Sequence, residues 1–375
     1  GNATNGISYG NSNNVALTVD LGGHVVTGTG NTAVGIPSGH SGTSLTVQNG
    51  TVRGAISAAG ASSENCTLTL EKLNMTSNGD AGVGANGALS DGLKLTLTDC
   101  TLTSTNDNNM TTGIFFPVEK GVLTIENSTI TGYNTGVQAY AGSVTITGED
   151  TVITGSGVSV PNIDDETNEL AETGPIFDGS AVSIIDRNTD YGGLTSVKIE
   201  NGNFRTDASD AEYGAVHIAS EVEGQPGTFE KFDNTSSGDK PVQISGGTYS
   251  APVAPELCAT DKAPLVKADG TCSIISPAES GIQDYIEQDG TYYENEDALA
   301  ATHVAKVNDQ YYSTLQAAID AATNGATIIL LDDITLKQET SNENGTGIEI
   351  RKSLVLDGQG HTISNGDGVT RAVRI

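Results

Sequence analysis

The sequence predicts an all-β protein built as a parallel β-helix, a solenoid of short stacked strands. The first observation is a ten-residue pattern that returns along the chain, as in LTIENSTITG at Leu123–Gly132. It alternates apolar and polar residues, turns at a polar corner and alternates again, as two short strands do. A unit this small cannot bury its apolar face alone, so neighbouring copies must stack on one another.

The pattern occurs in six copies that keep one spacing. In each, the first apolar residue and the apolar residue of the closing triplet lie seven positions apart. The other five copies are LTVQNGTVRG (Leu45–Gly54), LTLEKLNMTS (Leu68–Ser77), LTLTDCTLTS (Leu95–Ser104), VKIENGNFRT (Val197–Thr206) and VQISGGTYSA (Val242–Ala251). Three longer copies, in which the distance is nine, are LTVDLGGHVVTG (Leu17–Gly28), VTITGEDTVITG (Val144–Gly155) and LVLDGQGHTISN (Leu354–Asn365).

The second observation is the spacing between copies, and the third is an additional strand before most of them. Successive copies start 21 to 28 residues apart, except for two steps of 53 and 45 residues that we interpret as coils with insertions. The additional strands are GISY (Gly6–Tyr9), AVGI (Ala33–Ile36), GIFF (Gly113–Phe116), GVQA (Gly136–Ala139), AVSI (Ala181–Ile184) and AVHI (Ala215–Ile218). Such steps suit one three-strand coil, with adjacent coils about 4.8 Å apart. An antiparallel sandwich is the alternative, although it gives no reason for one corner sequence to recur.

The chain divides into three predicted regions. Residues 1–250 form the main β-helix, with insertions at Pro161–Gly179 and from Ser220 onward. Residues 251–304, Pro-rich and then acidic and Tyr-rich, indicate a linker with a small hairpin. Residues 305–375 begin a short cap helix with Ser313 as its N-cap, followed by the first coils of a second β-helix. The helix is predicted from apolar residues at helical spacing, namely Leu315, Ala318, Ile319 and Ala322.

The composition is strongly acidic. Lys and Arg number 17 and Asp and Glu 47, which gives a net charge of −30. Such a surface repels nucleic acid and anionic membranes, so we expect no nucleic-acid partner. The sequence contains no apolar run of 18 residues, so we expect no membrane insertion. The chain starts in the middle of the repeat and has no visible signal peptide, which indicates a processed protein or a fragment.

The four cysteines fall into two pairs of different character. Cys66 and Cys100 lie within the repeat and are predicted to be small buried apolar residues. Cys258 and Cys272 bracket a mostly polar segment with a turn-like Ala-Asp-Gly, and in an oxidising compartment they are candidates for a disulfide.

The additional strands offer one outward row of side chains that we interpret as a ligand-binding strip. An aromatic face stacks on a sugar ring, while amide and imidazole groups bond its hydroxyls. The predicted ligand-binding residues are Phe115, Gln138, Ser183 and His217, with Tyr140 at the edge of the row. The alternative is a scattered set of exposed aromatic residues with no shared role.

A calcium loop is predicted from oxygen-bearing residues at alternate positions, Asp186, Asn188 and Asp190. Glycine falls one place late for such a loop, and no Glu stands at the twelfth position. Solvated loop carboxylates are the alternative, and calcium is the one cofactor that the sequence suggests.

Three segments resemble a known family. The run from Tyr312 to Thr335 and the corner LDGQGHTIS (Leu356–Ser364) resemble right-handed, pectate-lyase-like β-helix domains of large bacterial cell-surface proteins. Residues Ile244–Ile274 are similar to the segment that closes such a helix in surface proteins of Gram-positive gut bacteria. The resemblance implies a secreted or cell-surface protein, and its motifs specify architecture rather than chemistry.

The polysaccharide lyases and hydrolases of this fold need clustered carboxylates with a basic residue. Here Arg53 and Arg205 fall at one outward register position and have no acid beside them in the repeat. We therefore predict no catalytic residue, and an enzyme is less favoured than a binding protein.

The main hypothesis is a non-catalytic extracellular β-helix module for adhesion or glycan binding at a bacterial surface. One alternative is a carbohydrate-active enzyme, lyase or hydrolase, with its site in the loops of residues 161–239. The other is a structural subunit of a head-to-tail extracellular filament, in which residues 305–375 dock on residues 1–28 of the same or another chain.

Overall fold

The computed structural model describes residues 6–8, 13–60, 62–85, 90–105, 111–160, 175–187, 191–208, 213–222, 225, 228–234, 241–278, 284–336, 346–366, 369 and 371–374. The chain is all-β with few helices, and a large sheet with mostly parallel pairing contains most of its strands. It divides into two compact units. Unit 1 consists of Gly1–Pro264 and Cys272–Ser280, and unit 2 of Leu265–Thr271 and Gly281–Ile375.

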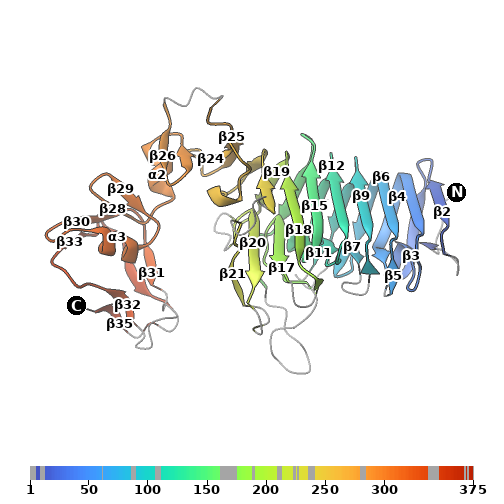
Figure 1. Ribbon diagram of the computed structural model, residues 1–375, viewed down its shortest axis with the longest axis horizontal. Coiled ribbons are helices and arrows are strands. Elements are labelled where there is room, and N and C mark those ends of the chain that lie inside the picture. The colour runs from blue at the N-terminus through green and yellow to red at the C-terminus, as the bar shows by residue number, and fades with distance from the viewer. Residues whose placement is uncertain are drawn as a thin grey trace. The chain divides into compact units, whose positions relative to one another are not determined.

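Most strands of unit 1 form three parallel columns. Within each column the strands stack in chain order, as the colours of Figure 1 show. The first column contains β2 (Ala16–Asp20), β4 (Ser44–Ala59), β6 (Thr67–Ser77), β9 (Lys94–Thr98), β12 (Val122–Glu126), β15 (Gly142–Thr147), β18 (Leu194–Ile199) and β22 (Val242–Ile244). The second contains β3 (Val25–Gly35), β4, β6, β10 (Thr101–Ser104), β13 (Thr129–Thr131), β16 (Val152–Gly155), β19 (Asn203–Thr206) and β23 (Thr248–Tyr249). The third contains β1 (Ile7–Ser8), β3, β4, β7 (Ala81–Ala85), β11 (Thr112–Phe116), β14 (Thr135–Ala139), β17 (Val182–Asp186) and β20 (Val216–Glu221).

The register of the first column is the one that the repeat predicts. The residues that open the copies pair in sequence, namely Leu17, Leu45, Leu68, Leu95, Leu123, Val144, Val197 and Val242. From Leu45 to Val242 these side chains are 0% exposed, so they form a continuous apolar ladder. All neighbouring strands within the three columns are parallel, and the antiparallel-sandwich alternative is therefore wrong for them.

The corner between the first and second columns has a left-handed backbone at one recurring position. The residues there are Asn49, Lys72, Asp99 and Asn127, with φ of 58°, 51°, 52° and 44°. Asn and Asp tolerate this conformation better than other residues with a side chain, because their short polar groups bond the local backbone. This requirement explains why the corner of the repeat is polar.

The second column of unit 1 ends on aromatic rather than aliphatic residues. Phe204 and Tyr249 are neighbours in the second column, and their rings stack 5.0 Å apart at 15°. The remaining elements are β5 (Ser63–Glu64), β8 (Ser90–Asp91), β21 (Phe229–Lys231), the 3-10 turn η2 (Pro255–Leu257), β24 (Ala263–Val266), which extends into unit 2, and β25 (Cys272–Ile275).

Unit 2 contains a hairpin followed by a short helix, and this arrangement occurs twice. The first copy is β26 (Ile286–Gln288), β27 (Thr291–Tyr293) and α2 (Glu296–Ala301), and the second is β28 (Ala305–Val307), β29 (Gln310–Tyr312) and α3 (Leu315–Ala321). Asn295 and Thr314 cap the two helices by accepting from the backbone N–H three residues on. The predicted N-cap Ser313 is therefore wrong by one residue, because the Thr314 hydroxyl reaches Ala317 N at 3.1 Å. The first copy lies in the region predicted as a linker.

The rest of unit 2 consists of three parallel strand pairs. They are β30 (Thr327–Leu330) with β33 (Val355–Asp357), β31 (Ile334–Leu336) with β34 (Ile363–Asn365), and β32 (Thr346–Glu349) with β35 (Arg371–Arg374). The apolar face of α3, including Leu315, Ala318 and Ile319, belongs to the buried cluster of this unit. The predicted docking of residues 305–375 on residues 1–28 stays a prediction.

Among the described residues, no helix combines the length and the apolar character needed to span a membrane.

The ladder of the first column makes a matched pair of substitutions informative. Ile125 is 0% exposed inside the column, whereas its neighbour Thr124 points outward. We expect Ile125→Ala to lower the free energy of unfolding by about 2–5 kcal/mol through lost burial and a cavity. Thr124→Ala should lower it by less than about 1 kcal/mol. Urea denaturation followed by circular dichroism measures both, and equal effects would contradict the assigned register.

Candidate functional site

The four residues of the predicted strip share one register position in the third column. Phe115 pairs with Gln138, Gln138 with Ser183, and Ser183 with His217. The repeat therefore identifies correctly which side chains are stacked.

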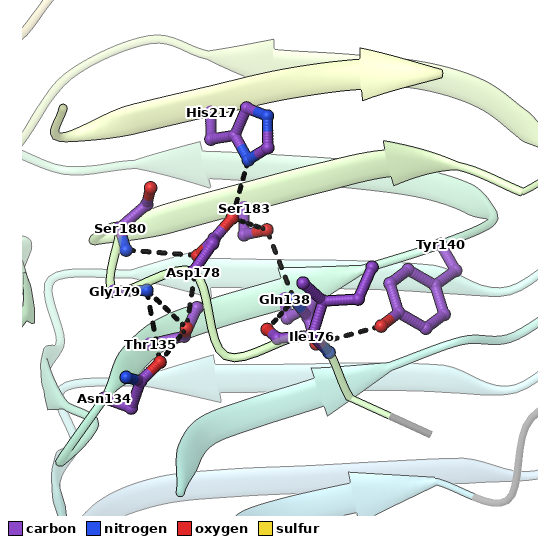
Figure 2. Close-up of polar contacts among 10 residues, drawn as sticks. All are labelled: Asn134, Thr135, Gln138, Tyr140, Ile176, Asp178, Gly179, Ser180, Ser183 and His217. Atoms are coloured by element: carbon purple, nitrogen blue, oxygen red, sulfur yellow. Dashed lines mark hydrogen bonds and ion pairs between the residues drawn. The ribbon is translucent and has the colours of Figure 1, made fainter. Parts of the chain in front are cut away.

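The expectation that this row is open to solvent is wrong for three of its residues. Gln138, Tyr140 and Ser183 are each 0% exposed. The cause is the segment Ile176–Ser180, which contains the end of the first insertion and lies over β14 and β17 (Figure 2). The amide of Gln138 fixes it, because Gln138 Oε1 accepts from Ile176 N at 2.8 Å and Nε2 donates to the Ile176 carbonyl. Phe115 is half-buried beside Tyr140, with ring centroids 5.3 Å apart and nearly perpendicular planes.

Asp178 is the centre of the polar contacts under this segment (Figure 2). Its Oδ2 accepts from Ser183 Oγ at 2.6 Å and lies 2.7 Å from His217 Nδ1. Its Oδ1 accepts from Ser180 N at 3.1 Å and lies 3.2 Å from Thr135 Oγ1. The Asp178 side chain is 1% exposed, so this carboxylate is buried but well supplied with hydrogen-bond donors.

Aspartate, histidine and serine meet here, but not in the order of a hydrolytic triad. A triad needs the serine hydroxyl to donate to the imidazole, so that the imidazole can take its proton. Ser183 instead donates to Asp178, and it is fully buried. The carboxylate orients His217, because an ionised Asp178 can only accept and Nδ1 must therefore donate. The opposite nitrogen of His217, Nε2, is then the one that can meet a ligand.

His217 forms one wall of a pocket of about 500 Å³. The Tyr213 ring stacks on the imidazole, with centroids 4.1 Å apart and planes at 19°. Phe229 meets the imidazole edge-on at 6.3 Å, on strand β21, which pairs antiparallel with β20. The other lining residues are Ile218, Ala219, Thr228, Glu230 and Lys231. We call this the His217 pocket. Of the five predicted ligand-binding residues, His217 lines this pocket, and the other four are not among its lining residues.

Sequence reasoning missed Tyr213 and Phe229. Tyr213 precedes the strand and Phe229 lies in the second insertion, where no periodicity applies. The available signal was the presence of one aromatic residue on either side of His217 in the chain.

A buried ion pair fastens the corner after β17. Arg187 Nε donates to Glu221 Oε2 at 2.8 Å, and the two side chains are 2% and 7% exposed. The guanidinium carbon lies 4.9 Å and 5.1 Å from the ring centres of Tyr140 and Tyr191. Burial by itself lowers the pKa of Arg187, but the hydrogen bond to Glu221 and the nearby tyrosines outweigh it, so the pKa is raised.

The predicted calcium loop begins at this corner. Asp186 Oδ1 accepts from Leu194 N at 2.9 Å, so one of its oxygens is used within the fold. Asn188 and Asp190 lie outside the described residues. Within the described part of the chain, no three or more His, Cys, Asp or Glu side chains gather in a way that could hold a metal ion.

The cysteines differ in their surroundings. Cys66 and Cys100 are 1% and 2% exposed, as predicted, and their thiols point to backbone carbonyls. Cys258 and Cys272 are also buried, and both lie close to Tyr249, whose pKa burial raises. The Cys258–Cys272 disulfide stays a prediction.

Comparison of the chain with protein-family models, with curated proteins and with solved structures gives no match. The proposal of a function therefore depends on the sequence and on the geometry of the His217 pocket.

The Arg187–Glu221 pair predicts a large difference between two glutamate substitutions. Glu221→Ala leaves a buried guanidinium without this counter-charge, which should lower the free energy of unfolding by about 3–5 kcal/mol. The control is Glu119→Ala, which removes a 2.9 Å pair with Lys120 whose side chains are 40% and 68% exposed. That change should cost about 1 kcal/mol or less. Urea denaturation measures both, and a small effect of Glu221→Ala would show that the pair is not buried.

We also expect Cys66 and Cys100 to resist alkylation in the folded protein at pH 8. Burial raises the pKa of both thiols, that of Cys100 to about 11, and the thiolate is the reactive form. Iodoacetamide followed by peptide mass spectrometry should label both only after denaturation. If the folded protein were labelled at these cysteines as fast as the protein in urea, their burial would be contradicted. The same peptide map, made without reductant, tests the Cys258–Cys272 disulfide.

Proposed function

We propose that this chain is a non-catalytic extracellular module of the right-handed parallel β-helix class, and that it binds glycans at a bacterial surface. The three columns support the β-helix, since each repeat contributes one strand to each column. The three parallel pairs of unit 2 support a second β-helix whose first coils follow the cap helix α3. The secreted or cell-surface location is part of this proposal and depends on the sequence resemblance.

The His217 pocket is the observation that carries glycan binding. Its volume of about 500 Å³ lies within the range of small-molecule sites. Tyr213 and Phe229 offer aromatic surface to the C–H face of a sugar ring. His217 Nε2, Thr228 and Glu230 offer polar atoms to its hydroxyls. Because Asp178 holds the imidazole, the wall is set before the ligand arrives, which lowers the entropic cost of binding.

Binding is favoured over hydrolysis by the carboxylates of the pocket. Glycoside hydrolases place two carboxyl groups about 5–10 Å apart across the scissile bond. Among the described residues that line the pocket, Glu230 supplies one carboxylate. Asp178 lies behind His217, where its oxygens accept from Ser183, Ser180 and His217. The carbohydrate-active enzyme remains the alternative outcome of the experiment below.

A glycan array with plant, mucin and bacterial-wall polysaccharides tests the proposal, followed by calorimetric titration of each hit. We expect binding, with Tyr213→Ala, His217→Ala and Phe229→Ala each lowering affinity by about tenfold or more. Thr124→Ala, on the outward face of the first column, should bind like the parent protein.

Two results would oppose the proposal. Binding that survives all three pocket substitutions would place the site elsewhere. Release of reducing or unsaturated sugars from a bound polysaccharide, abolished by Glu230→Gln, would establish an enzyme instead.

A further inference from the structure

The corner between β18 and β19 holds a backbone nitrogen close to the side-chain carbonyl of the residue before it. Gly202 N donates to Asn201 Oδ1 at 2.9 Å. Because Oδ1 is bonded to Cγ, a nitrogen within hydrogen-bond distance of the oxygen is also close to the carbon. Attack of that nitrogen on Cγ closes a succinimide ring, so this contact brings the two reacting atoms together.

The backbone of this corner differs from that of the earlier repeats. Asn201 stands at the repeat position of Asn49, Asp99 and Asn127, whose φ is positive. In this repeat the positive φ falls one residue later, at Gly202 with 126°. Glycine adopts such a backbone without strain, and it has no Cβ to hinder an approach of its nitrogen to Cγ.

Five Asn-Gly pairs lie wholly within the described residues, and Asn201–Gly202 is one of them. In three others the glycine N–H donates to a group outside the pair. The acceptors are Ser77 Oγ for Gly79 N at 3.2 Å, and Ser353 O for Gly325 N and Leu336 O for Gly366 N, both at 2.8 Å. In the fifth pair, Asn49 Nδ2 donates to Asp20 Oδ2 at 3.0 Å, which fastens that side chain to the neighbouring coil.

Exposure and geometry predict opposite orders of reaction for these asparagines. Asn78, Asn324 and Asn365 are exposed, whereas Asn201 is half-buried. If exposure to water set the rate, the three exposed asparagines would react first. If the position of the glycine nitrogen sets it, Asn201 reacts first, because its neighbour's nitrogen is already held beside the side-chain carbonyl.

We propose that Asn201 is a site of spontaneous covalent modification, at which the folded chain forms a succinimide and then isoaspartate. Gly202 N forms a bond to Asn201 Cγ and gives its proton to water. The bond from Cγ to Nδ2 breaks, and Nδ2 takes up a proton and leaves as ammonia. Water then opens the ring, at Cγ to give aspartate or at the main-chain carbonyl carbon to give isoaspartate. Water is the one co-reactant, and the reaction does not depend on whether the His217 pocket binds a glycan.

Isoaspartate lengthens the backbone of this corner by one carbon, at a place where the next coil leaves no room. A Cβ on Gly246 would lie 2.2 Å from the Glu200 carbonyl oxygen. Thr248 N, at the start of β23, donates to the Gly202 carbonyl at 2.9 Å. The coil that contains β22 and β23 therefore lies directly on the corner, and we expect the modification to loosen it.

The experiment is incubation of the full chain at pH 8.5 and 37 °C, with samples taken over several weeks. A parallel incubation in guanidinium chloride gives the rate of each pair in the unfolded chain. Trypsin releases residues 199–205 as one peptide, in which fragment ions distinguish Asn201 from Asn203. Mass spectrometry with electron-transfer fragmentation measures the conversion and separates isoaspartate from aspartate.

The ratio of the folded rate to the unfolded rate decides the proposal, because it removes the effect of local sequence. We expect this ratio at Asn201 to exceed that at Asn78, Asn324 and Asn365 by about tenfold or more. A smaller advantage would overturn the proposal, as would modified Asn201 that contains aspartate without isoaspartate. Asn201→Gln is the matched control, since it keeps the amide but cannot close a succinimide, and its peptide should stay unmodified.

Hydrogen exchange tests the effect on the last coil. After incubation, the amides of β22 and β23 should exchange faster in the modified chain than in Asn201→Asp, which adds the charge but not the extra backbone carbon. Equal exchange in the two proteins would overturn the proposed loosening.

Discussion

In-register parallel stacking is the constraint on which the rest of unit 1 depends. Each strand satisfies its backbone hydrogen bonds only through the strands of the neighbouring repeats, so equivalent positions must superpose along a column. A position that points inward in one repeat therefore points inward in all, and the opening position of the first column is apolar in every copy. Leu68, Leu95 and Leu123 obey this rule with no exposed surface. A one-residue slip would turn the whole ladder outward.

The same constraint fixes the backbone of the corners and leaves the outside of the columns to vary. Asn49, Asp99 and Asn127 adopt a left-handed conformation at one position, because the chain must leave the first column in the same direction each time. Outward positions need not carry the same type of residue in every repeat, so side chains that bind a ligand can occur there. In the third column, the outward position holds Phe115 in one repeat and His217 in another.

The sequence could predict whatever follows from this periodicity. The alignment of the opening residues, the burial of Cys66 and Cys100 and the shared register of the outward row were all predictable, because each is a statement about one repeat position. The N-cap of α3 was misplaced by one residue, since Ser313 and Thr314 both carry a hydroxyl that suits the role. The exposure of Gln138 and Ser183 could not be predicted, because the segment that covers them belongs to an insertion outside the repeat.

The insertion determines what the outward row can do, through a single carboxylate. Asp178 comes from the insertion, and it contacts Thr135 on one side and His217 on the other. Thr135 Oγ1 in turn lies 2.8 Å from Asn134 Oδ1, so these buried polar contacts extend from His217 to Asn134 (Figure 2). Displacing His217 would remove one donor from the Asp178 carboxylate, whose side chain is 1% exposed, and this costs more than the same change at the surface. A ligand of the His217 pocket must therefore fit a wall that the fold has already set, since Asp178 ties His217 to the stacked strands beneath it.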